Sequence, residues 1–205
     1  MKTKRRIEII TERVAGKRVL DIGCVDHTAE MEQGEFWLHG HIRRNAAQTL
    51  GLDLEADEVA KLVARGYDVV CGDAEEVDLG RTFEVVVAGE LIEHLSSPGR
   101  FLRNAHRHLE PGGLLLLTTP NAFYPKRLLE IVRGRRAQVH PQHVSWYCPQ
   151  TLAAAVRRAG FVDVEVVPFD NTERFRWIVD PLTSWRPWFS TNLLVSARKP
   201  ADGAA

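Results

Sequence analysis

The sequence has few cysteines and no excess of charge of either sign. Three of the 205 residues are cysteine, at positions 24, 71 and 148. Their odd number and wide spacing argue against a disulfide framework and against zinc motifs built from paired thiolates. Lysine and arginine total 27, as do aspartate and glutamate, so no overall field attracts nucleic acid or an anionic membrane. A partner of that kind would need a local patch, such as the basic stretch at 127–138.

Long hydrophobic runs are also absent. No apolar stretch approaches the roughly 18 residues that a membrane-spanning helix needs, and the basic start lacks the apolar segment of a secretion signal. The composition, 44% apolar and 26% charged, is that of a globular protein. We therefore expect a soluble, cytoplasmic protein whose residues 1–205 form one domain.

Apolar runs of strand length alternate with helical patterns through the first two-thirds of the chain. The predicted strands cover 18–23, 49–53, 67–72, 83–89 and 113–119. The clearest helices are 55–65, where Val59, Leu62 and Val63 share a face, and 99–109, which is expected to end at "EPGG". This order predicts an α/β fold, a doubly wound, Rossmann-like, mostly parallel sheet with helices on both faces.

The last third of the chain is less regular. A helix is predicted to begin near 149 and to end at Gly160, and two further strands are predicted at 161–169 and 192–199. The remaining stretches are too long for simple connections. We expect insertions at about 24–48, 120–148 and 170–190.

The turn after the first strand is half of a glycine loop. Gly23 lets a ligand approach the backbone, and free N–H groups follow it. The second glycine of a dinucleotide loop is missing, because Val25 and Asp26 stand there, and Asp26 places negative charge where two phosphates would lie. This disfavours NAD and FAD, and a nicotinamide oxidoreductase is the least favoured hypothesis.

Carboxylates follow the predicted strands at positions that suit a nucleoside. In doubly wound folds the ligand lies beyond the carboxyl ends of the strands. Asp53 ends the second strand, where an acid can accept hydrogen bonds from ribose hydroxyls. Asp73 follows the third strand, where it could contact an adenine edge. Together with Asp21 and Gly23, these residues predict a ligand with a ribose but no diphosphate.

Five stretches resemble a known family. They are "VLDIGC", "GLDLEADEV", "VVCGDAEEVDL", "FEVVVAGELIEHLSSPGRFLRNAHRHLEPGGLLLLTTPN" and "HPQHVSWYCPQTLAAAVRRAGF". Over roughly residues 17–168 the chain resembles class I S-adenosylmethionine-dependent methyltransferases, in particular the small-molecule branch near the ubiquinone-biosynthesis O-methyltransferases. The resemblance implies a seven-stranded sheet with an antiparallel last strand and S-adenosylmethionine as the cofactor.

The resemblance also implies roles for individual residues. Asp21 and Gly23 would lie beside the methionine end of the cofactor, and Gly89 and Glu90 near the sulfonium. The ribose would lie at Asp53 and Leu54 and the adenine at Asp73 and Ala74. The departure is at Val25 and Asp26, where the family usually has glycines, and Asp26 could favour a cationic ligand.

Candidates for the chemistry come from the histidines and from Glu90. Methyl transfer mainly requires alignment and exclusion of water, with an optional base for a hydroxyl acceptor. His143 and His140, in the insertion that the family uses near the acceptor, are the candidate bases, and Glu90 completes the predicted catalytic set. The alternative is that His143 only ties the insertion to the sheet. His94 is expected to be structural.

A second group of histidines and several tryptophans are left without a firm role. His27, His39 and His41 could join His140 or His143 as metal ligands, but their spacing matches no zinc motif, and we predict no metal. We expect Trp37 and Leu38 to pack as a lid, with these histidines solvated or facing the substrate. The tryptophans at 177, 185 and 188 suit a hydrophobic acceptor pocket or a dimer contact.

The sequence therefore predicts a methyltransferase that acts on a small molecule, most simply at a hydroxyl oxygen. Two alternatives stay open. One is a non-catalytic, adenosylmethionine-binding or regulatory module. The other is an RNA methyltransferase, because tryptophans among arginines can stack on bases, although the neutral charge balance predicts no nucleic-acid partner. A homodimer is compatible with the sequence.

Overall fold

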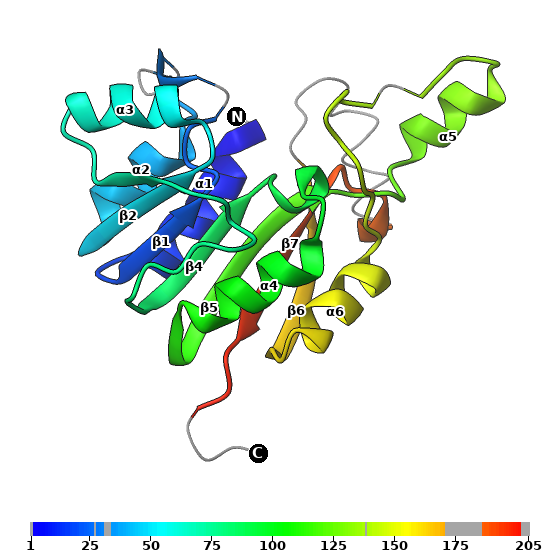
Figure 1. The fold of residues 1–205 in the computed structure, drawn as a ribbon. Helices are drawn as coiled ribbons and strands as arrows, with labels where there is room; N and C mark the ends of the chain where they lie inside the picture. The colour runs from blue at the N-terminus through cyan, green and yellow to red at the C-terminus, as the bar shows by residue number, and fades with distance from the viewer. Residues whose placement is uncertain (1, 27, 31–33, 138, 171–185, 202–205) are drawn as a thin grey trace.

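A single seven-stranded sheet forms the centre of the computed structural model, which describes residues 2–26, 28–30, 34–137, 139–170 and 186–201 (Figure 1). The strands are β1 (Arg18–Ile22), β2 (Gln48–Asp53), β3 (Val69–Cys71), β4 (Phe83–Gly89), β5 (Leu109–Pro120), β6 (Val162–Phe169) and β7 (Asn192–Arg198). Their order is β3-β2-β1-β4-β5-β7-β6. β1 to β5 pair in parallel, and β7 is antiparallel to both of its neighbours. The predicted sheet, with its antiparallel last strand, is confirmed.

Helices cover both faces of this sheet (Figure 1). They are α1 (Lys2–Val14), α2 (Leu38–Asn45), α3 (Ala56–Ala64), α4 (Pro98–Arg107), α5 (Pro125–Val132) and α6 (Pro149–Arg158), with the short helices η2 (Ile92–His94) and η3 (Pro187–Phe189). α4 and α6 share one hydrophobic cluster with the sheet, and α1 and α2 share another. β4 serves both clusters, because Val86 and Ala88 point to the first while Val85 and Val87 point to the second. The alternation is the two-residue period of a strand.

Three details of the predicted elements are wrong. The helix expected over 99–109 ends at Arg107, and β5 already begins at Leu109. The strand continues through "EPGG" because its pairing with β4 shifts register there, as in a β-bulge. The strand expected at 67–72 is only three residues long. Val63 is 51% exposed although Val59 and Leu62 are buried, because α3 covers only the β3 edge of the sheet, where one narrow stripe of the helix is buried.

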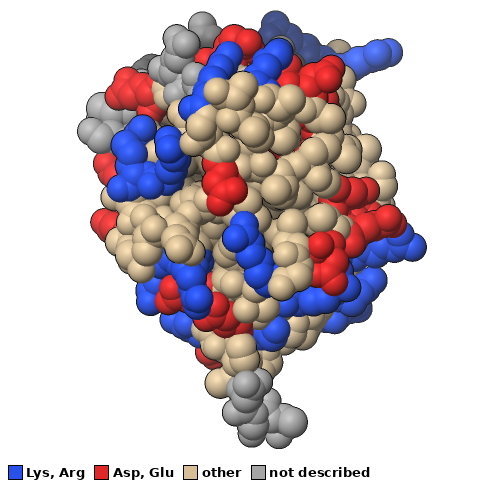
Figure 2. Space-filling model, turned by 60° about the vertical axis from the view of Figure 1, so that its left-hand side comes forward, with Lys and Arg blue, Asp and Glu red and all other residues tan. Residues whose placement is uncertain are grey.

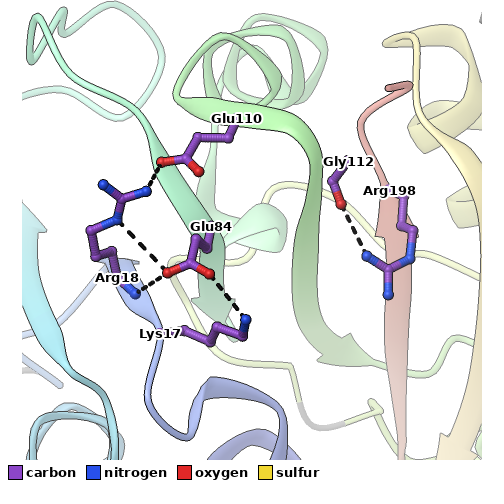
Figure 3. Close-up of polar contacts among 6 residues, drawn as sticks. All are labelled: Lys17, Arg18, Glu84, Glu110, Gly112 and Arg198. Atoms are coloured by element: carbon purple, nitrogen blue, oxygen red, sulfur yellow. Dashed lines mark hydrogen bonds and ion pairs between the residues drawn. The ribbon is translucent and has the colours of Figure 1, made fainter. Parts of the chain in front are cut away.

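Ion pairs join β1, β4 and β5 near the residues where these strands begin (Figure 3). Glu84 on β4 accepts hydrogen bonds from Lys17 Nζ at 3.0 Å and from the Arg18 backbone N–H at 3.1 Å. The Arg18 guanidinium also reaches Glu110 on β5. The charged side chains are about one-third to one-half exposed, so each pair adds at most about 1 kcal/mol. Together they fix the relative positions of β1, β4 and β5.

Charges of both signs are interspersed on the face shown in Figure 2. This matches the equal totals of acidic and basic residues. Among the described residues, no helix combines the length and the apolarity that crossing a membrane requires.

Candidate active site

A cavity of about 760 Å³ opens at the carboxyl ends of the parallel strands. All ten of the predicted site residues line it, namely Asp21, Gly23, Asp53, Leu54, Asp73, Ala74, Gly89, Glu90, His140 and His143. They come from the ends of β1 to β4 and from the segment 140–143. The fold therefore brings the predicted residues together around one space, while their individual roles stay predictions.

The turn after β1 keeps the backbone of a glycine loop without its second glycine. Gly23 has φ +78°, and a Cβ there would lie 3.3 Å from a methyl carbon of Leu91. Asp26 adopts φ +54°, a conformation that aspartate enters more easily than most residues with a side chain. The Val25 N–H donates to the Asp53 carboxylate at 3.0 Å. Asp53, at the end of β2, thus holds in place the loop that follows β1.

The Asp21 carboxylate at the end of β1 is held by a buried contact with His39. His39 on α2 lies 2.8 Å from Asp21 on β1, measured from Nδ1 to Oδ2, and their side chains are 1% and 3% exposed. Burial raises the pKa of Asp21, and the hydrogen bond to His39 opposes this. Trp37 packs against the His39 ring and donates its indole N–H to the Cys24 carbonyl at 2.8 Å. Gly51 leaves the space for this packing, since a Cβ there would lie 2.9 Å from His39 Cε1.

The second group of histidines was expected to be solvated or to face the substrate, and His39 does line the cavity. His39 is neither solvated nor a ligand candidate with His140 or His143, because its ring is buried against Asp21. His41 lies on α2 with Nε2 2.7 Å from the Glu35 carbonyl oxygen, and His27 lies outside the described residues. Trp37 and Leu38 do line the cavity. Trp188 is 48% exposed, and the other two tryptophans of that group lie outside the described residues.

Asp53 and Asp73 each combine a local contact with a place at the cavity. Asp53 accepts N–H groups on both oxygens, from Val25 at 3.0 Å and from Glu55 at 3.2 Å. Asp73 Oδ1 accepts the Glu75 N–H at 2.8 Å, which closes a turn after β3. A carboxylate has about four acceptor positions, so both residues retain capacity for hydroxyl or amine groups of a ligand.

Two glutamates after β4 form the most unusual electrostatic feature. Glu90 has φ +54°, and Asn192 Nδ2 donates to its Oε2 at 2.9 Å. Glu93 is buried, and Thr119 donates to its Oε2 at 2.9 Å. Burial and the charge of Glu90 raise the pKa of Glu93 to about 8, and burial also raises the pKa of Glu90. In each residue the other oxygen is buried and has no hydrogen-bond partner among the described residues.

Arg6 on α1 is a cavity residue that the sequence analysis missed. It lines the same space, and its charge opposes the rise in the pKa values of Asp21 and Glu90. Its Nε atom is buried without a hydrogen-bond partner among the described residues. An arginine fork of this kind is suited to a carboxylate ligand.

Three histidines meet at the far wall of the cavity. The His143 ring centroid lies 4.6 Å from that of His94 and 5.2 Å from that of His140. Burial, followed by the charges of the other two histidines and of Arg127, lowers the pKa of His143 to about 4. His143 is therefore neutral at pH 7. His94, which we expected to be structural, is the member that sequence reasoning left outside the site.

The cavity fits an amino-acid-bearing nucleoside. Asp53 and Asp73 offer acceptors for ribose and adenine, and Gly23 permits close approach to the loop. Arg6 offers an unpartnered guanidinium nitrogen where a carboxylate could bind, while Asp21 and Glu90 offer oxygens for an ammonium or sulfonium group. Donors and acceptors of the kinds that S-adenosylmethionine requires are therefore present in the cavity, and Asp26 at its mouth disfavours a diphosphate.

Comparisons with known proteins give the same result. A family model described as a methyltransferase domain matches residues 3–166. A ubiquinone biosynthesis O-methyltransferase of Bradyrhizobium sp. (strain ORS 278) is 35% identical over 125 residues, which are 58% of this chain and 46% of that protein. A probable S-adenosylmethionine-dependent methyltransferase of Mycolicibacterium smegmatis is 31% identical over 166 residues, 77% of this chain and 58% of that protein. The chain thus spans about half the length of these relatives.

A solved structure has the same fold. The crystal structure of an S-adenosylmethionine-dependent methyltransferase from Mesorhizobium loti aligns with a TM-score of 0.64 at 21% identity, covering 97% of this chain and 98% of that one. The family model alone accounts for most of the sequence, from the start of α1 into β6. The chain therefore belongs to the S-adenosylmethionine-dependent methyltransferases.

Proposed function

We propose that this chain transfers the methyl group of S-adenosylmethionine to a hydroxyl oxygen of a small molecule. The observation that carries the proposal is the shared cavity, in which carboxylates suited to a nucleoside and a group of three histidines line one space. When bound, the cofactor supplies a methyl group on a sulfonium, which an oxygen can displace directly. The names of the ubiquinone biosynthesis relatives favour an oxygen acceptor.

The residues of this chain would divide the work between the two ends of the cavity. Arg6, Asp21, Asp53 and Asp73 hold and orient the cofactor, and Glu90 lies near its sulfonium. Lid residues such as Trp37 exclude water, which strengthens every polar contact inside the site. The chain, residues 1–205, acts as one domain in which the segment 120–148 covers the acceptor.

His143 is the proposed base, with His140 beside it. Because its pKa is about 4, His143 is unprotonated at neutral pH and can accept a proton, although such a low pKa makes it a weak base. A cofactor held by Arg6, Asp21, Asp53 and Asp73 would supply the methyl group to the acceptor oxygen, and the electron pair of the broken carbon–sulfur bond would stay on sulfur. The hydroxyl proton passes to the histidine. Alignment carries most of the rate enhancement in this scheme.

Calorimetry and an acceptor screen test the proposal. S-adenosylmethionine and S-adenosylhomocysteine should both bind with one site per chain. Release of S-adenosylhomocysteine should then be measured with matched panels of phenols, aliphatic alcohols and amines, and with transfer RNA as a separate arm. Turnover with hydroxyl acceptors supports the proposal. Turnover with amines or RNA alone contradicts it, and the absence of binding at millimolar ligand would end the enzyme hypothesis in favour of a non-catalytic module.

A further inference from the structure

The three histidines at the cavity wall form a cluster of nitrogen donors. One ring nitrogen from each of His94, His140 and His143 lies within 4.8 Å of the others. His94 ends the short helix η2, and the other two come from the segment 140–143. Side chains from two distant parts of the chain therefore converge on one point.

Backbone hydrogen bonds hold the two segments together. The N–H groups of Val144 and Ser145 donate to the Glu93 carbonyl at 2.9 and 3.2 Å. The His143 N–H donates to the His140 carbonyl at 3.0 Å, which closes a turn and places both rings on the same side. The cluster is thus built from fixed backbone positions, which is what a preformed ligand site requires.

The spacing of the nitrogens is close to that of a metal site. Zinc–nitrogen bonds of about 2.0–2.1 Å place tetrahedral ligand nitrogens about 3.3 Å apart. Small side-chain rotations would close the present separation of up to 4.8 Å. Three imidazoles with one open coordination position are the donor set of catalytic rather than structural zinc sites.

Two buried carboxyl groups and an arginine lie around the three histidines. The unpartnered oxygens of Glu90 and Glu93 lie in the wall of the same cavity. The Arg127 guanidinium, whose charge acts on His143, is held 3.9 Å over the Trp146 ring, and Trp146 in turn packs edge-on against His143. Arg6 lines the cavity as well, and burial raises the pKa of both carboxyl groups, so a metal site there rests on the three imidazoles.

We propose that His94, His140 and His143 bind one divalent transition-metal ion, of the class that prefers imidazole ligands such as zinc, cobalt or ferrous iron. The open coordination position faces the cavity. In the part of this proposal that rests on the proposed function, an oxygen of the acceptor occupies that position. A metal held there would lower the pKa of the acceptor hydroxyl, whose proton would pass to solvent water, and His143 would act as a ligand instead of a base. Acceptors with two adjacent oxygens, such as vicinal diols and catechols, are the class best suited to such a site.

Metal titration of the tag-free, chelator-treated protein tests the binding itself. Cobalt(II) should give visible absorption bands that saturate at one equivalent, and zinc should displace them. Each of the variants His94→Ala and His143→Ala should weaken zinc binding at least tenfold. His41→Ala is the matched control, because His41 is a histidine on α2 that has no place in the cluster, and it should bind zinc as the unchanged protein does.

Thermal denaturation guards against variants that merely misfold. Zinc should raise the Tm of the unchanged protein and of His41→Ala with concentration, since a ligand that binds only the folded state stabilises it. At the same zinc concentrations the Tm of folded His143→Ala should rise less. Failure to saturate at one equivalent overturns the proposal, as does zinc affinity in His94→Ala and His143→Ala equal to that of the unchanged protein.

A parallel titration with S-adenosylhomocysteine separates this proposal from the proposed function. Metal binding without nucleoside binding sustains the metal site and contradicts the methyltransferase activity. Nucleoside binding without metal binding is compatible with the methyltransferase activity and contradicts the metal site. If both bind, turnover of a catechol should fall at least tenfold on chelation and recover with zinc, cobalt or ferrous iron. Unchanged turnover after chelation refutes the placement of the acceptor oxygen on the metal.

Discussion

Replacing Asp53 with alanine tests whether the end of β2 holds the ribose. Two of the roughly four acceptor positions of a carboxylate are used by the N–H groups of Val25 and Glu55. Two remain for ribose hydroxyls. Because Asp53 is only partly buried, the expected loss of cofactor binding is about 1–3 kcal/mol, the scale of hydrogen bonds to a charged group. This corresponds to a dissociation constant about 5 to 150 times higher.

The same substitution also removes the support of the first loop, so affinity alone is ambiguous. An S-adenosylhomocysteine analogue without the 2′-hydroxyl separates the two effects. If Asp53 binds that hydroxyl, the substitution should weaken binding of the complete ligand by at least about 1 kcal/mol more than binding of the analogue, which is a coupling energy between residue and hydroxyl. A loop effect alone would weaken both ligands equally.

Isothermal titration calorimetry on four combinations of protein and ligand measures this coupling. Asp68→Ala is the control, because Asp68 is an exposed aspartate just before β3, at the other end of the strands. It removes the same charge without touching the cavity and should bind as the unchanged protein does. Affinity of Asp53→Ala within twofold of the unchanged protein, or a coupling energy near zero, would show that the ribose lies elsewhere.

Three further predictions concern packing, thiol chemistry and the carboxylate of the ligand. Gly51→Ala should lower the free energy of unfolding in urea by about 1–3 kcal/mol, because its Cβ would lie 2.5 Å from a Val69 methyl carbon; Gly99→Ala, whose Cβ meets only a flexible arginine end at 3.5 Å, should be neutral or slightly stabilising. Iodoacetamide followed by mass spectrometry should label Cys148 and spare Cys24 in the folded protein, since burial raises the pKa of Cys24. In Cys148 burial also raises the pKa, but hydrogen bonds from Thr151 and Gln150 together outweigh it, so the pKa is lowered. Labelling of Cys24 at the rate of Cys148 would contradict the packing of the loop. Arg6→Gln should weaken S-adenosylhomocysteine by about 1.5–3 kcal/mol and leave adenosine, which has no carboxylate, unaffected; equal losses for both ligands would place Arg6 outside the ligand contacts.

The strands could be predicted because buried parallel strands are continuous apolar runs. "FEVVVAG" forms β4 with the predicted bounds. Parallel strands end at one edge of a sheet, so the carboxylates that follow them could also be predicted to line one cavity. The helix α1 was missed because its start is basic, although Ile7, Ile10 and Val14 have helical spacing and are all buried. That signal was present in the sequence.

Other parts of the site have no local signal. The contact between His39 and Asp21 depends on how an irregular insertion folds back over β1, and periodicity does not encode that path. The histidine cluster depends on two backbone hydrogen bonds to Glu93 from residues about 50 positions later. Backbone hydrogen bonds do not depend on the identity of the side chain, so the residue types in the two segments do not predict that the segments pair. What the sequence does offer is the short spacing of His140 and His143, which suits two rings on one side of a turn.

The loop after β1 keeps the backbone conformation of a glycine loop although Val25 and Asp26 stand where glycines are usual. Val25 directs a buried side chain into the cluster beside α3, while its N–H is held by Asp53, so a glycine is not needed there. Asp26 takes the left-handed conformation that a glycine would take, at a cost of about 1–2 kcal/mol. Its exposed side chain then adds a negative charge at the mouth of the cavity. A diphosphate would be repelled there, while a cationic ligand gains a favourable field, so the substitution narrows the range of ligands instead of abolishing the site.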